Sequence, residues 1–80
     1  MEPLDAVVTV LHDADEPLHW TVIQDRALRR GLIDPFVVTN VRATLLRALR
    51  DGVRAGTVMR IDTGVYALPP PIGDGSGTEG

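Results

Sequence analysis

Apolar side chains recur along residues 3–13 at the spacing of one helical face. The apolar positions are Leu4, Val7, Val8 and Leu11. Spacings of three and four residues place such side chains on one side of an α-helix, and Pro3 suits a first helical position. Pro17 ends the pattern, because it has no amide donor and disfavours helical backbone at the residue before it. We therefore expect a first helix over residues 3–13, followed by an acidic turn.

A second helix is expected over residues 21–30, after the short extended piece Leu18-His19-Trp20. Thr21 can cap this helix, and Gln24 three positions later completes a capping-box pattern. Gly31 follows as the residue just beyond the helix end, a position that favours left-handed backbone.

A third helix is expected over residues 39–53, capped by Thr39 or Asn40. Its apolar arc comprises Val41, Leu45, Ala48 and Leu49, extended by Leu46 and Val53. We expect Gly52 to weaken the helix beyond Asp51, because glycine is a poor helix former. The connection from the second helix, residues 32–38, is punctuated by Asp34-Pro35.

Residues 57–68 show the pattern of a β-hairpin. Residues 58–61 are predicted as one strand, Asp62-Thr63-Gly64 as a tight turn and residues 65–68 as the returning strand. A lone hairpin is barely stable in water, so this one must pack against the helices.

The elements together predict an α+β domain over residues 1–68. Its fold is a winged helix-turn-helix, with three helices, a short strand before the second and a C-terminal two-stranded wing. Residues 69–80, rich in proline and glycine, are expected to form a flexible tail.

The composition narrows the class of protein. A chain of 80 residues suits one domain, and the lack of cysteine excludes disulfides and cysteine-based zinc sites. His12 and His19 have no third strong ligand at metal spacing, and no catalytic set can be recognised. We therefore expect no metal, no cofactor and no enzymatic activity. No apolar run reaches the ~20 residues of a membrane span. Residues 1–15 also lack the basic start of a signal peptide, so we expect a cytoplasmic protein without membrane contact.

Charge is divided unevenly along the chain. The formal net charge is −3, and residues 1–25 hold six acidic side chains and no basic one. Residues 26–60 hold all eight arginines against two aspartates, a formal charge of +6. This asymmetry predicts a polarised surface with one basic face. The alternative is that the arginines only solvate exposed helix faces.

The outer face of the third helix offers polar contacts. In helix-turn-helix proteins the second helix of the pair enters the major groove with its N-terminal residues at the base edges. Asparagine can bond adenine, arginine can bond guanine or phosphate, and Ala43 permits close approach. With the helix start and the wing included, the expected DNA-binding residues are Thr39, Asn40, Ala43, Arg47, Arg50, Arg54, Arg60 and Thr63.

Three other polar residues are not expected to bind DNA or to act in catalysis. Arg42 falls on the apolar arc, so we expect it to snorkel or to pair with Asp25 or Asp34. We expect His19 to be a packing residue and His12 to be exposed near a helix end.

Four segments resemble the HARE-HTH family of winged helix-turn-helix domains. They are residues 17–23 (PLHWTVI), 27–33 (ALRRGLI), 39–45 (TNVRATL) and 64–68 (GVYAL). The chain departs from the family pattern at residues 34–39, which replace a Gly or Lys followed by Thr-Pro, and at Met59, which takes an aromatic position. Members occur in some restriction endonucleases, chromatin-associated proteins and the delta subunit of bacterial RNA polymerase.

The resemblance implies a transcription-related or DNA-associated adaptor whose partner is double-stranded DNA. The delta-subunit member resembles a polymerase-binding module, so a second hypothesis stays open. In that case the domain docks on RNA polymerase or another regulatory protein through its acidic first helix and turn. The oligomeric state is not predicted.

Overall fold

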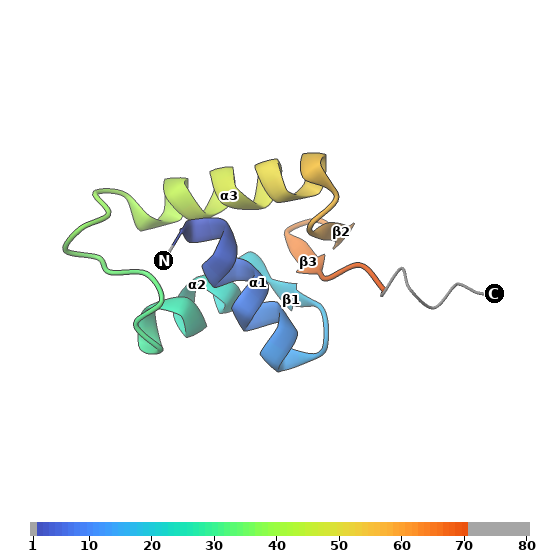
Figure 1. The fold of residues 1–80 in the computed structure, drawn as a ribbon, viewed down its shortest axis with the longest axis horizontal. Coiled ribbons are helices and arrows are strands. Elements are labelled where there is room, and N and C mark those ends of the chain that lie inside the picture. Colours follow the sequence, from blue (N-terminus) through green and yellow to red (C-terminus); the bar gives the residue numbers. More distant parts are fainter. Residues whose placement is uncertain (1, 71–80) are drawn as a thin grey trace.

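A computed structural model describes residues 2–70, and its elements follow one another in the order α1, β1, α2, α3, β2, β3 (Figure 1). The three helices and one three-stranded antiparallel sheet form an α+β fold compatible with a winged helix, as the sequence predicted. The predicted tail lies mostly outside the described residues. Pro69 and Pro70, its described part, have no regular secondary structure.

Helix α1 (Pro3–Ala14) confirms the first predicted helix and extends one residue beyond it. Pro3 occupies the first turn, where its missing N–H costs nothing. The helix ends at Asp15, whose left-handed backbone (φ 54°) lets its N–H donate to the Leu11 carbonyl. The acidic turn then leads into strand β1 (Leu18–His19).

Helix α2 (Trp20–Arg29) begins one residue earlier than predicted, and its expected cap is wrong. His19, not Thr21, is the N-cap: its Nδ1 accepts a hydrogen bond of 3.2 Å from the Thr21 N–H. The reason is that β1 runs directly into the helix with His19 in extended backbone, where an imidazole nitrogen can replace the usual hydroxyl. At the other end Gly31 has φ 72°, as predicted, and its N–H donates to the Leu28 carbonyl.

Helix α3 (Val41–Ala55) starts at the predicted cap, because the Asn40 side chain accepts a hydrogen bond of 3.0 Å from the Ala43 N–H. The prediction that Gly52 weakens the helix beyond Asp51 is wrong, since the helix continues through Gly52 to Ala55. Gly52 is buried, and a Cβ there would lie 2.8 Å from Leu4 Cδ1 and 3.0 Å from Val58 Cγ2. Glycine at this position therefore allows α1 and the start of the hairpin to approach α3 closely.

The sheet contains β1, β2 (Met59–Asp62) and β3 (Val65–Ala67) in the order β1-β3-β2. Both strands of the predicted wing are present, although Val58 lies before β2 and Leu68 after β3. Gly64 has φ 73° in the turn, and one irregularity in the pairing falls between Arg60 and Asp62. Because β1 pairs with β3, the hairpin is joined to the helical part of the fold.

The core lies between α1, α2, α3 and the hairpin. Its largest fully buried side chains are Leu11, Ile23, Leu45, Leu49, Val7, Val10 and Val58. Each such side chain contributes about 1.5–3 kcal/mol through burial. Helix α1 packs against both other helices, and α3 runs along one side of the molecule with α1 beneath it (Figure 1). Val53, predicted on the core arc, is instead 38% exposed near the end of α3.

Candidate nucleic-acid interface

The predicted outer face of α3 is exposed along its whole length. Asn40, Ala43, Arg47, Arg50 and Arg54 are all exposed, whereas Leu45, Ala48 and Leu49 on the opposite side are buried. The exposed residues are spaced by three or four positions, so they form one stripe on the helix. We call these five residues the α3 stripe. At a rise of 1.5 Å per residue, the stripe is about 20 Å long.

Most arginines near the stripe have no carboxylate partner among residues 2–70. Arg50 lies 3.7 Å from an Asp51 carboxylate oxygen, and both side chains are more than half exposed. No described carboxylate lies within 4.0 Å of Arg47, Arg54 or Arg60. An exposed ion pair such as Arg50–Asp51 is worth about 0–1 kcal/mol, so a phosphate can compete for that guanidinium.

The wing residues Arg60 and Thr63 are exposed, as is Thr39 before the cap of α3. Arg60 lies in β2 opposite Tyr66 of β3, and the Thr63 N–H donates to Asp62 Oδ1 within the turn. The eight predicted DNA-binding residues therefore divide into a long helical stripe with its preceding residue and a pair on the hairpin. They share exposure rather than a common pocket.

Trp20 connects the wing turn to the first turn of α3, and sequence reasoning did not assign it this role. Its backbone N–H donates to the Gly64 carbonyl at 2.8 Å. Its ring carries the Arg42 guanidinium, whose carbon lies 5.3 Å from the ring centroid. A cation over an aromatic face is attracted by the quadrupole of the ring. No single-sequence signal pairs these positions, because they are 22 residues apart.

The predicted acid partners of Arg42 are wrong. Asp25 pairs with Arg29 at 3.1 Å, one helical turn along α2. Asp34 accepts a hydrogen bond of 2.9 Å from the Phe36 N–H in its own turn. Both carboxylates are satisfied close by in sequence, so Arg42 is left to the nearby indole. The expectation that Arg42 has a structural role is otherwise consistent with this contact.

The two histidines lie at different places. His12 is exposed, as predicted, and its ring nitrogen is 3.6 Å from an Asp13 carboxylate oxygen. His19 is exposed rather than buried, but it has the structural role expected of it: its Nδ1 caps α2 and its ring lies against Gly64. Within residues 2–70, no group of three or more His, Asp and Glu side chains is placed to hold a metal ion.

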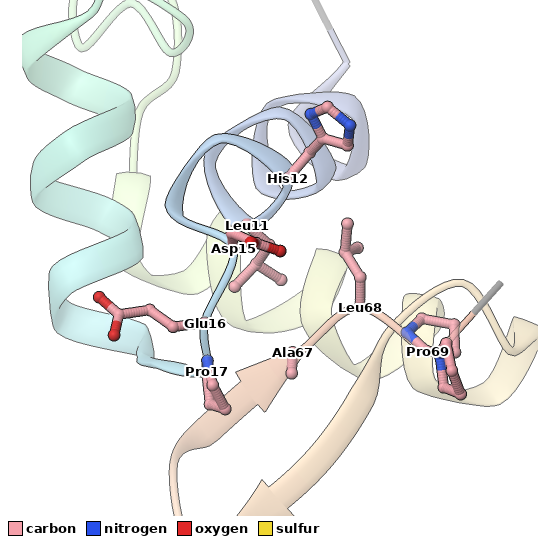
Figure 2. Close-up of a pocket in the computed structure, with 9 residues that line it drawn as sticks. Leu11, His12, Asp15, Glu16, Pro17, Ala67, Leu68 and Pro69 are labelled. Carbon is pink, nitrogen blue, oxygen red and sulfur yellow. The ribbon is translucent and has the colours of Figure 1, made fainter.

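Asp13, Asp15 and Glu16 form an acidic surface at the end of α1 and in the turn that follows it. Asp13 forms an ion pair of 2.6 Å with Arg30, and the hydrogen bond and charge of this guanidinium lower the pKa of Asp13. A shallow groove of about 730 Å³ lies nearby between the end of α1 and the end of β3 (Figure 2). It is lined by Leu11, His12, Asp15, Glu16, Pro17, Ala67, Leu68, Pro69 and Pro70. Its walls are thus largely apolar, with two carboxylates among them.

No helix of the described chain has both the length and the apolar character needed to cross a membrane. Comparison with protein-family models, curated proteins and solved structures finds no match to this chain. The similarity to HARE-HTH domains consequently rests on the four sequence segments alone.

Proposed function

We propose that this domain binds double-stranded DNA as a transcription-related or DNA-associated module, with α3 in the major groove and the wing against the backbone. The α3 stripe supports this proposal: its exposed arginines lack strong acidic partners among the described residues. An α-helix with its side chains is about 10–12 Å wide, which matches a major groove about 12 Å wide.

The positions along the stripe suggest distinct roles. Ala43, in the first turn, allows the helix backbone to come close to the bases. Arg47, one turn later, has the length and the donors to reach a guanine edge. Arg50 and Arg54 lie farther from the helix start, where phosphates of the groove wall are the nearer acceptors. Arg60 on the wing would bind the backbone beside the groove.

The net charge of −3 does not oppose this function, because the charges are separated. Six carboxylates belong to residues 1–25, in α1, α2 and the adjoining turns, whereas residues 40–63 carry five arginines against two aspartates, Asp51 and Asp62. At about 0.15 M salt the Debye length is about 8 Å, so carboxylates beyond that distance are largely screened. Binding should therefore depend on local rather than total charge.

The test is fluorescence anisotropy with a labelled duplex, using wild-type chain and Arg47→Ala/Arg50→Ala. We expect the double variant to lose at least about tenfold in affinity at low salt, because two phosphate or base contacts are removed. The matched control is Arg26→Ala/Arg29→Ala, which removes the same charge from α2. If both double variants bind as tightly as the wild type, the α3 stripe is not a DNA surface.

A second candidate function is docking on RNA polymerase or another regulatory protein, favoured by the groove at the acidic surface. Leu68 points toward α1 inside this groove, while Glu16 lies on its margin (Figure 2). Titrating bacterial core RNA polymerase against Glu16→Lys, with Glu2→Lys at the other end of α1 as the charge control, tests this docking. Loss of polymerase affinity in Glu16→Lys alone would favour docking. If both variants bind the polymerase as tightly as the wild type, this groove is not the docking site.

A further inference from the structure

We infer that the domain binds duplex DNA with little dependence on base sequence, because α3 presents a single side chain, Arg47, that is free to hydrogen-bond base edges. This inference rests on the proposed DNA-binding function and deepens it by naming the substrate class. It follows from what each polar side chain in the first two turns of α3 is already doing.

Asn40 is used by the helix itself. Its Oδ1 accepts the hydrogen bond from the Ala43 N–H at 3.0 Å, which satisfies one of the unpaired amides of the first turn. Reading adenine requires the same amide to present its oxygen and its NH2 group together to N6 and N7. With the oxygen directed at the helix backbone, Asn40 retains only its NH2 group for DNA. Its two N–H donors are accepted by phosphates and by several base edges, so without the oxygen beside them they discriminate little.

The neighbouring positions add no further reader. Ala43 has no polar group beyond its backbone, and Thr44 is half-buried. Arg42 lies outside the α3 stripe, on the apolar arc of the helix, with its guanidinium over the Trp20 ring. Among the residues of the first two turns, this leaves Arg47, which is exposed and has no carboxylate within 4.0 Å in residues 2–70.

The remaining cations favour the backbone. Arg50 and Arg54 belong to the third and fourth turns of α3, and Arg60 belongs to the wing. Together with Arg47 they offer about four phosphate or guanine contacts, which predicts a slope of log K against log salt of about −3 to −4. Phosphate contacts fix the position of the protein on the duplex and carry no sequence information.

The experiment is selection from a library of duplexes with a randomised centre, using the full 80-residue chain, followed by anisotropy on individual duplexes. We expect unrelated duplexes to bind within about fivefold of one another, with a modest preference for guanine, whereas sequence-specific proteins discriminate by about 10³ or more. Arg47→Lys keeps the charge but loses the bidentate hydrogen bonds to guanine. It should therefore remove the guanine preference and preserve the slope of log K against log salt. Arg26→Lys on α2, outside the α3 stripe, is the matched control and should change neither.

Asn40→Ser separates capping from base reading. Serine keeps an oxygen that can cap the helix but has no amide to pair with adenine. We expect the variant to melt near the wild-type temperature and to bind within about twofold of it on every duplex. Recovery of one dominant sequence, or loss of an adenine preference in Asn40→Ser, would overturn the inference and leave DNA binding intact. Failure to bind any duplex at low salt would overturn the proposed function as well.

Discussion

The Arg42 guanidinium lies over the Trp20 ring, 5.3 Å from its centroid, and joins the first turn of α3 to the first turn of α2. The Trp20 backbone also bonds the Gly64 carbonyl in the wing turn. One indole residue thus contacts both surfaces that the proposed DNA interface uses. The angle between α3 and the hairpin should depend on Trp20 together with the pairing of β1 and β3, in which His19 lies opposite Val65.

Replacing Arg42 should weaken this junction. Arg42→Ala removes the cation and is expected to lower the free energy of unfolding by about 0.5–1 kcal/mol, the range of an exposed cation–π contact. Trp20 is the single tryptophan, so urea unfolding followed by its fluorescence reports directly on the site. Arg42→Lys, which retains a cation, should lose less. Equal stability of all three proteins would show that the contact contributes nothing.

Periodicity and caps were sufficient to predict most of the fold. The three helices, the strand before α2 and the hairpin all follow from local signals such as Pro3, Gly31 and the turn at Gly64. Local signals succeed here because each acts within about four residues of the chain. Exposure of the α3 stripe was predictable for the same reason, since one helix face must be apolar if the other is solvated.

Two of the failures involve partners distant in sequence, whereas the cap of α2 was missed over a separation of only two residues, between His19 and Thr21. Gly52 was expected only to weaken α3, because its close approach to Leu4 and Val58 exists only in the packed structure. Arg42 was matched with acids because the neighbouring indole depends on how α2 crosses α3. The sequence did identify Asn40 as both a cap and a DNA contact. Only the hydrogen bond to Ala43 shows how the first role limits the second.

Gly52→Ala should destabilise the protein even though alanine is the better helix former. Alanine gains about 1 kcal/mol of helix propensity over glycine. Its Cβ would lie 3.0 Å from Val58 Cγ2, and overpacking of this kind costs about 1–3 kcal/mol. We expect a net loss of about 1 kcal/mol in chemical unfolding. Because the other short contact is to the end of the Leu4 side chain, Leu4→Ala should reduce the penalty of Gly52→Ala. Additive effects of the two substitutions would contradict this packing.

Gly64→Ala should cost more than Gly31→Ala, although the two glycines share nearly the same backbone (φ 73° and 72°). Left-handed backbone costs an L-residue about 1–2 kcal/mol in either case. Only at Gly64 would the new Cβ also lie 2.8 Å from His19 Nε2; at Gly31 nothing lies within 4 Å. Thermal unfolding of the two variants isolates the crowding, and we expect Gly64→Ala to melt several degrees lower. Identical melting temperatures would mean that the wing turn does not press on His19.

The ion pair between Asp13 and Arg30 should make stability depend on pH in the acidic range. The hydrogen bond and charge of Arg30 lower the pKa of Asp13 below its ordinary value of 3.8 in the folded protein. A lowered folded pKa means that the stabilisation is fully present above the unfolded value and disappears as pH falls through the folded one. Urea midpoints measured from about pH 6 to about pH 2.5 should therefore fall less steeply in Arg30→Gln than in the wild type.

Arg26→Gln removes the same charge from a residue with no described carboxylate partner, and its pH profile should keep the wild-type slope. A profile for Arg30→Gln that parallels the wild type would show that Asp13 gains no stability from this pair, and that the end of α1 is held to α2 by apolar packing alone.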